Sequence, residues 1–176
     1  MIDRDEFFDG YLDAILFTES VGALPTPRMT ELFAEIESAR QLGRDPQKQF
    51  CELASIEEEV RDDTSLLSHG CSRDDFTDEA RAELREDCED FVDAELADLE
   101  LYCELRGDWQ GASDSFGRSS YSASECAGTD FWFSRNGHGA GFFARGNDPV
   151  FNRLQAAAKV YSSVSVYFDG EHIHAS

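Results

Sequence analysis

The sequence predicts an α+β protein in which about three to four N-terminal helices are followed by a small antiparallel sheet of three to four strands with one helix packed on it. Two patterns support this fold class. Up to about residue 105, apolar residues recur at steps of three and four, which is the period of an α-helix. After residue 127, short aromatic and β-branched runs alternate with glycine-containing turns, which is typical of strands. With 176 residues, 41% of them hydrophobic, we expect residues 1–176 to form a single domain.

Four helices are expected before residue 106. The first follows Asp3, a suitable N-cap, and presents one apolar face. Two more are expected over residues 31–42, with Thr30 as the N-cap, and over residues 47–60. The longest is expected over residues 77–105. Its predicted apolar stripe consists of Leu84, Cys88, Phe91, Val92, Leu96, Leu99 and Cys103.

The C-terminal part is expected to form the sheet. Two aromatic strands are predicted over residues 129–135 and 140–146, and Asn136-Gly137 is a strong hairpin signal between them. Asp148 then caps a helix whose first residue is a proline. Further strands are expected over residues 162–169 and 171–175. Residues 127–174 are therefore predicted to form a core of β-hairpin, helix and β-strand.

The charge of the chain is strongly acidic and unevenly distributed. The net charge is −22. Residues 1–110 contain 31 Asp and Glu against 10 Lys and Arg, whereas residues 111–176 contain six and five. Direct binding of nucleic acid by the acidic part is excluded because phosphates would be repelled. A basic protein is the expected partner, and neither a membrane nor a nucleic acid is expected to bind directly.

The acidic residues of the longest helix recur on one side, at helical steps. Like charges spaced in this way weaken a helix, and after Arg85 no basic residue occurs until Arg106. We expect a partner-binding acidic surface that consists of Glu57, Glu58, Glu59, Asp62, Asp63, Asp74, Asp75, Glu83, Glu86, Asp90, Asp93, Glu100 and Glu104. A line of carboxylates of this length could imitate several base pairs of DNA phosphate. A solubilising acidic face or adaptation to high salt would produce the same pattern without a partner.

The stretch "RNGHGAG" looks like a candidate ligand loop, with Asn136 and His138 as its polar side chains. Its glycine spacing does not fit a dinucleotide fingerprint, and no helix is expected to begin there. His138 could act as a general base, but the sequence identifies no partner for it. A tight turn between two strands explains the glycines better. We therefore expect no catalytic residues.

No cofactor or metal site is expected. His172 and His174 would share one face of a strand, but two histidines do not make a metal site. The five cysteines include no C-x-x-C pair, and the first residues do not have the pattern of a signal peptide. We therefore expect reduced, mostly buried thiols and a cytoplasmic location.

Three stretches together resemble a family of small, uncharacterised bacteriophage and prophage proteins. They are "GYLDAILFTES", "SRDDFTDEARAELREDCEDF" and "AGTDFWFSRNGHGAGFFARG" with the "LQAAAKVYSSVSVYFDGEHIH" that follows it. The specific element is the C-terminal motif FW-x-x-R-N-G-H-G-A-G-F. The resemblance implies phage origin and action in the cytoplasm of an infected bacterium. The chain departs from the family over residues 24–65, which look like a helical insertion.

The leading hypothesis is a binding protein and not an enzyme: a phage-encoded acidic DNA mimic that inhibits a host nucleic-acid-binding defence complex of the restriction or CRISPR type. One alternative is a small enzyme or ligand-binding domain centred on the Gly-His-Gly hairpin. A second alternative is an assembly module that uses an aromatic sheet through Phe131, Trp132 and Phe142. The oligomeric state is left open.

Overall fold

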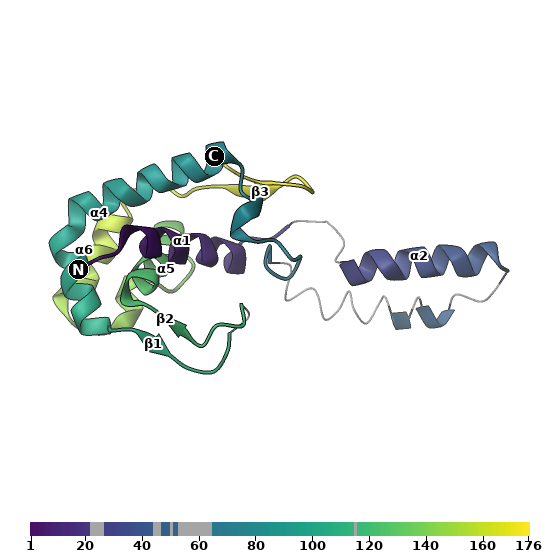
Figure 1. Cartoon of the computed structure of the whole chain (residues 1–176), viewed down its shortest axis with the longest axis horizontal. Coiled ribbons are helices and arrows are strands. Elements are labelled where there is room, and N and C mark those ends of the chain that lie inside the picture. The colour runs from purple at the N-terminus through teal and green to yellow at the C-terminus, as the bar shows by residue number, and fades with distance from the viewer. Residues whose placement is uncertain (22–26, 44–46, 50, 53–64, 115) are drawn as a thin grey trace.

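A computed structural model describes residues 1–21, 27–43, 47–49, 51–52, 65–114 and 116–176, and it confirms the α+β class (Figure 1). The helices and strands are, in chain order, α1 (Arg4–Thr18), α2 (Pro27–Gln41), the 3-10 helix η1 (Arg73–Asp75), α4 (Asp78–Arg106), β1 (Trp109–Gln110), β2 (Ser120–Tyr121), α5 (Ala123–Asn136), the 3-10 helix η2 (Phe142–Arg145), α6 (Pro149–Ala158), β3 (Val166–Phe168) and β4 (Ile173–Ala175). None of the helices in these described ranges has an apolar stretch long enough to cross a bilayer.

The strands form two separate antiparallel hairpins, each of two strands, and not one sheet of three to four strands. In one hairpin Trp109 pairs with Tyr121. In the other, β3 pairs with β4 through Tyr167 and His174, where the C-terminal strands were predicted. The predicted sheet is therefore correct in its last hairpin and wrong in its size.

The two predicted aromatic strands at residues 129–135 and 140–146 are wrong, because these segments belong to α5 and η2. A capping box begins α5: the Ser122 side chain accepts from the Glu125 backbone, and the Glu125 carboxylate accepts from the Ser122 backbone. Gly137, with φ 75°, ends the helix as a left-handed C-cap, so Asn136-Gly137 marks a helix end and not a hairpin turn. The core of residues 127–174 is accordingly mainly helical.

Helices α1 and α5 cross at very close range. A Cβ atom on Gly128 would lie 1.8 Å from the Phe7 carbonyl oxygen, and one on Gly10 would lie 2.0 Å from the Glu125 carbonyl oxygen. The Thr129 hydroxyl also donates to the Gly10 carbonyl at 3.1 Å. Glycine is therefore required at both positions, because only hydrogen fits between the two backbones.

The core is an aromatic cluster between α1, α4, α5 and α6. Phe91 stacks on Phe131 with ring centroids 4.0 Å apart, and Tyr11 meets Trp132 edge to face at 5.3 Å. Phe142 from η2 is also fully buried and lies 6.0 Å from Phe91. Offset and edge-to-face pairs of this kind stabilise a core beyond the area they bury.

Most of α4 follows its prediction. Thr77 caps it, and the buried stripe runs through Leu84, Phe91 and Leu99 as expected. Leu96 was predicted in the stripe but is 40% exposed. Glu95, directly before it, departs from helical dihedral angles (φ −114°, ψ 20°), and the helix bends there. The change of direction places Leu96 at the edge of the buried face.

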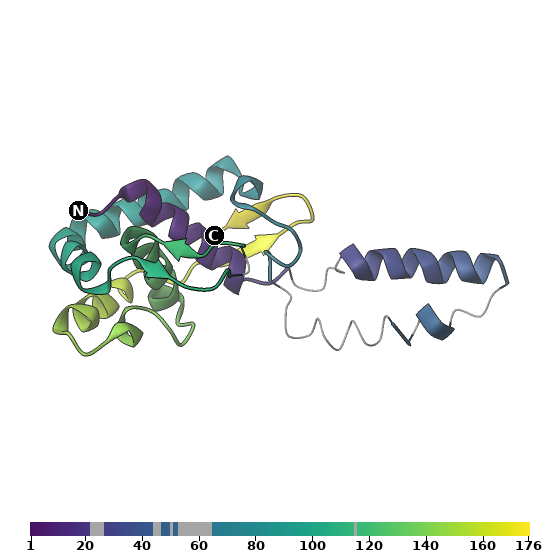
Figure 2. The same cartoon turned by 60° about the horizontal axis from the view of Figure 1, so that its bottom comes forward.

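Helix α2 lies to one side, clear of the other elements labelled in Figure 1, and it stays apart from them in the turned view of Figure 2. It begins at Pro27, so Thr30 lies inside its first turn, and the prediction of Thr30 as the N-cap is wrong. Residues 47–49 and 51–52 are helical, as predicted, and the rest of the segment 47–60 lies outside the described residues.

The helices and hairpins built from residues 1–21 and 65–176 are called the body below. The chain leaves the body and returns to it at a single place. Ser20 and Ser65 form an antiparallel bridge, and the Leu66 amide donates to the Glu19 carbonyl at 2.8 Å. Among the described residues, the members of the main hydrophobic core come from residues 2–21 and 66–173. The body therefore draws its core from outside residues 22–64.

We expect a variant in which a Gly/Ser linker of about four residues replaces residues 22–64 to keep the fold of the body, because paired backbones across the bridge are close enough for a short turn. Its near-UV circular dichroism should match that of the full chain, since Trp109 and Trp132 both lie in the body. Its free energy of unfolding should change by less than about 2 kcal/mol. Loss of cooperative urea unfolding in this variant would show that the body depends on the insertion.

Candidate functional site

The predicted acidic residues of α4 form one stripe along the helix. All of Glu83, Glu86, Asp90, Asp93, Glu100 and Glu104 lie on α4, and all are exposed except Glu100, which is half-buried. Asp93 makes an ion pair with Arg4. The other five make no ion pair within the part of the chain that the structure describes. The stripe bends with the helix at Glu95 and is therefore not a straight rod.

Of the remaining predicted acidic residues, the structure describes Asp74 and Asp75, and both lie on η1 and not on α4. Asp75 is engaged in the η1 capping box, where its carboxylate accepts from the Ser72 amide at 2.6 Å. Asp74 is exposed beside it on η1. The other five, Glu57, Glu58, Glu59, Asp62 and Asp63, lie outside the described residues.

Several further acidic residues hold the fold together through arginines distant in sequence. Asp13, 7% exposed at its side chain, accepts two hydrogen bonds from Arg73, both at 2.6 Å, and also contacts Arg118 at 3.2 Å. Hydrogen bonds from Arg153 lower the pKa of Asp98 despite the opposing effect of partial burial. The acids thus fall into two groups, one paired in the fold and one free on α4.

An exposed apolar ridge runs beside the free carboxylates in the second half of α4. Ala97, Leu101 and Leu105 are spaced four residues apart and share one side of the helix. Leu101 is 37% exposed and Leu105 is 49% exposed. Glu100 and Glu104 directly precede the two leucines, so this surface combines apolar contact area with negative charge.

The predicted ligand loop follows α5 and serves the packing of the chain. The Asn136 side-chain oxygen accepts from the Val164 amide at 3.0 Å. His138 is exposed, stacks beside Trp132 at 5.8 Å and lies 3.4 Å from the Glu19 carboxylate. Neither of the two described pockets is lined by His138. The structure thus gives Asn136 a structural contact and places His138 beside the Glu19 carboxylate.

The motif residues that carry the family resemblance form buried polar contacts. Arg135, 5% exposed at its side chain, donates to the Tyr11 hydroxyl at 2.9 Å and the Ser162 carbonyl at 2.7 Å, and it pairs with Asp87 at 2.7 Å. Burial, together with neighbouring acidic groups, raises the pKa of the Tyr11 hydroxyl well above its usual range despite the arginine. Arg135 therefore ties α5 to α1, α4 and the chain after α6.

Asp130 is the most deeply buried acid of the motif region. Its carboxylate accepts from Arg145 Nε at 2.7 Å and from the Tyr102 hydroxyl at 2.7 Å, and it has no exposed surface. Burial and the Asp130 charge raise the pKa of Tyr102 above its usual range, so this hydroxyl stays protonated and donates. These contacts join α4, α5 and η2.

The aromatic surface expected of an assembly module is absent at the residues predicted to form it. Phe131, Trp132 and Phe142 are each fully buried in the core of the chain itself. The Trp132 indole donates to the Thr18 hydroxyl at 2.8 Å. These three side chains therefore do not present an aromatic face to a second molecule.

The two C-terminal histidines do not share a metal site in the described parts of the chain, where no group of three potential ligands occurs. His174 stacks on Tyr167 at 4.8 Å and lies 2.8 Å from the Asp169 carboxylate, and His172 is exposed just before β4. Backbone and His174 hydrogen bonds lower the pKa of Asp169. These contacts stabilise the β3–β4 hairpin.

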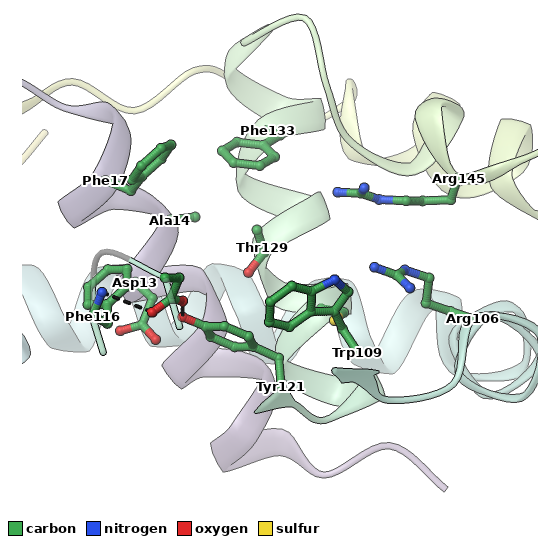
Figure 3. Close-up of a pocket in the computed structure, with 12 residues that line it drawn as sticks. Asp13, Ala14, Phe17, Arg106, Trp109, Phe116, Tyr121, Thr129, Phe133 and Arg145 are labelled. Carbon is green, nitrogen blue, oxygen red and sulfur yellow. Dashed lines mark hydrogen bonds between the residues drawn. The ribbon is translucent and has the colours of Figure 1, made fainter. Parts of the chain in front are cut away.

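A pocket of about 300 Å³ lies between α1, α5, the β1–β2 hairpin and the end of α4 (Figure 3). Its aromatic walls are Phe17, Trp109, Phe116, Tyr121 and Phe133. Arg106 and Arg145 enter it from the same side (Figure 3). No local sequence pattern marks this pocket, because five separate segments of the chain contribute to it.

Comparison of the chain with models of known protein families, with curated proteins and with solved structures gives no match.

Proposed function

We propose that this chain is a binding protein whose α4 surface docks on a basic surface of another protein. The proposed target is a host nucleic-acid-binding protein, such as a restriction or CRISPR-type defence complex, whose basic groove the acidic surface would occupy. The observation that carries the proposal is the row of free carboxylates beside an exposed apolar ridge on one helix. The resemblance of the C-terminal motif to bacteriophage and prophage proteins supports the choice of target class.

The free carboxylates are unusual because the chain uses its arginines elsewhere. Arg4, Arg85, Arg135 and Arg153 each pair with an acid, but none pairs with Glu83, Glu86 or Asp90. Like charges three or four residues apart weaken a helix by a few tenths of a kcal/mol each, as in the step from Glu83 to Glu86 and from there to Asp90. A role in binding would explain why these carboxylates are left without ion pairs. A solubilising role would explain the same arrangement without any partner.

The size of the stripe limits what charge alone can do. Glu83 to Glu104 covers about 30 Å along the helix path at 1.5 Å per residue. Duplex DNA presents about 18 charges over that length, at one per ~1.7 Å. Five free carboxylates reproduce only part of this charge. We therefore assign the carboxylates to steering and salt sensitivity, and the ridge of Leu101 and Leu105 to the affinity of the docked state.

This proposal predicts that neutralising the stripe slows association without unfolding the protein. The stripe variant carries Glu83→Gln, Glu86→Gln, Asp90→Asn, Glu100→Gln and Glu104→Gln. With a partner retained from bacterial host lysate, surface plasmon resonance at 50 mM salt should show an association rate roughly 10–100-fold below that of the unchanged chain. A DNA duplex of about 25 base pairs should compete with the unchanged chain for that partner. The matched control neutralises two exposed acids outside α4, through Glu37→Gln and Glu171→Gln.

The ridge serves as the second arm of the same experiment. Leu101→Ser with Leu105→Ser should raise the dissociation rate roughly tenfold or more, because anchors of an interface act mainly on dissociation. Val160→Ser is the control, since Val160 is 82% exposed and lies outside α4. Equal retention of partners by the stripe variant and the unchanged chain, or failure of DNA to compete, would contradict the proposal and favour a solubilising face.

A further inference from the structure

We propose that the pocket between α1, α5 and the β1–β2 hairpin binds a small aromatic molecule that carries one anionic group. This site goes beyond the proposed function and does not depend on it. Its surface combines aromatic rings with two arginine side chains, which matches the mixture of apolar walls and a few convergent polar groups found in small-molecule sites.

The aromatic walls leave a slot for a flat ring. Phe133 lies on one side of the pocket and Trp109 on the opposite side, with Thr129 between them (Figure 3). Trp109 is held in place by its partner Tyr121, at 5.9 Å between ring centroids. Phe17 is 54% exposed and lines the same pocket, so it offers a further ring surface that the fold itself does not cover.

The acids that line the pocket are already engaged. Asp13 is paired with Arg73 and Arg118. Asp114 accepts from the Tyr121 hydroxyl and from the backbone amides of Phe116 and Arg118. Burial acts to raise the pKa of Asp114, but these hydrogen bonds outweigh burial and lower the pKa. The carboxylate therefore stays ionised and bonded within its own loop. Neither acid is free to accept a ligand cation.

Of the two arginines that line the pocket, Arg145 is paired with Asp130, and Arg106 has no ion pair with a described acid. Its Nε atom is buried and has no hydrogen-bond partner, and no described acid forms an ion pair with its guanidinium. Buried donors are almost always satisfied in folded proteins, so an open one at a pocket wall indicates a missing acceptor. The gap is notable in a chain with 37 acidic and 15 basic residues, where an acid is easily found.

Arg145 provides a second donor on the same side. Its Nε and Nη2 atoms bond to Asp130, and none of the hydrogen bonds within the described chain uses its Nη1 atom. The Arg145–Asp130 pair is neutral overall, so Arg106 supplies the uncompensated positive charge. An anion with two oxygen atoms suits two guanidinium groups that enter from one side.

The size of the pocket selects a ligand with one ring. Its volume of about 300 Å³ is at the lower end of the range for small-molecule sites. Burial raises the pKa of the Cys126 thiol at the pocket wall, although Arg106 and Arg145 oppose the shift. This thiol therefore contributes an uncharged part of the pocket wall.

The test uses four probes in heteronuclear NMR titrations of the full chain. They are 3-phenylpropionate, its neutral analogue 3-phenylpropan-1-ol, phenyl phosphate and inorganic phosphate. We expect 3-phenylpropionate to shift the Trp109 indole signal and the Arg106 Nε signal, while the Trp132 indole, which donates to Thr18 and does not line the pocket, stays in place. The neutral alcohol should bind roughly tenfold more weakly, as expected for loss of a charge-assisted hydrogen bond. Tighter binding of phenyl phosphate than of the carboxylate would identify a phosphate as the natural anion.

Substitution at Arg106 separates recognition from folding. Arg106→Gln should lower the affinity for 3-phenylpropionate roughly tenfold and abolish its preference over the alcohol, and Arg106→Lys should restore part of the preference. Arg153→Gln, which removes an exposed arginine outside the pocket, is the matched control. The proposal is overturned if millimolar 3-phenylpropionate leaves Trp109 unshifted, or if inorganic phosphate binds as tightly as the aromatic anions. It is also overturned if Arg106→Lys loses the preference as completely as Arg106→Gln.

Discussion

Asp130→Ala is expected to lower the free energy of unfolding by about 3–5 kcal/mol, the usual cost of breaking a buried ion pair. Asp130 has no exposed surface, and its removal leaves the Arg145 guanidinium without its partner and the Tyr102 hydroxyl without its acceptor. Domains of this size are stable by about 5–15 kcal/mol in total, so the loss is a large part of the whole. Urea denaturation followed by circular dichroism measures it.

Two further variants show whether the pair itself is responsible for the loss. Asp93→Ala breaks the exposed contact with Arg4 and should cost less than about 1 kcal/mol. Combining Asp130→Ala with Arg145→Met should recover part of the lost stability, because the double variant no longer contains an unpaired buried charge. If Asp130→Ala costs no more than Asp93→Ala, the carboxylate does not hold η2 against α4 and α5.

Gly128→Ala is expected to destabilise the protein by about 3 kcal/mol, at the upper end of the usual cost of overpacking. The added methyl group would lie 1.8 Å from the Phe7 carbonyl oxygen, a backbone atom that cannot rotate away. Alanine favours a helix over glycine by about 1 kcal/mol, so the intrinsic preference opposes the expected loss and does not cancel it. Thermal and urea unfolding both measure the net change.

The control for this substitution measures the intrinsic preference separately. Ala82→Gly, at an exposed position of α4, should cost about 1 kcal/mol through helix propensity alone. Gly10→Ala should resemble Gly128→Ala, because its Cβ atom would lie 2.0 Å from the Glu125 carbonyl oxygen. Stabilisation by Gly128→Ala would mean that α1 and α5 separate easily and that their close crossing is not required.

Local signals in the sequence were sufficient to predict where three of the helices begin. Asp3 and Asp148 each cap a helix as predicted, and Thr77, expected as the first residue of its helix, caps α4; in each case the side chain and the amides it accepts from lie within three residues. Helix α5 was missed although its capping box, Ser122 to Glu125, is equally local. The aromatic pair Phe131 and Trp132 favours a strand by propensity and Gly128 disfavours a helix, and packing against α1 overrides both preferences.

The candidate surfaces were predictable to different degrees. The exposure of Glu83, Glu86 and Asp90 follows from helical periodicity, because the opposite face of α4 is apolar. Which acids are free does not follow from it, since Asp87 pairs with Arg135 and Asp98 with Arg153, both about 50 residues away along the chain. The aromatic pocket requires the fold, because its walls come from segments that meet only when α1 and α5 cross.

The junction at Ser20 and Ser65 has an evolutionary consequence. Because residues 22–64 leave and rejoin the body at one bridge, changes in the length of this segment act on the body mainly through loop closure. Each doubling of a flexible loop costs only about 0.6 kcal/mol. Length changes between these two serines should therefore cost the body little stability, and selection on the fold should restrict them less than changes in the aromatic core.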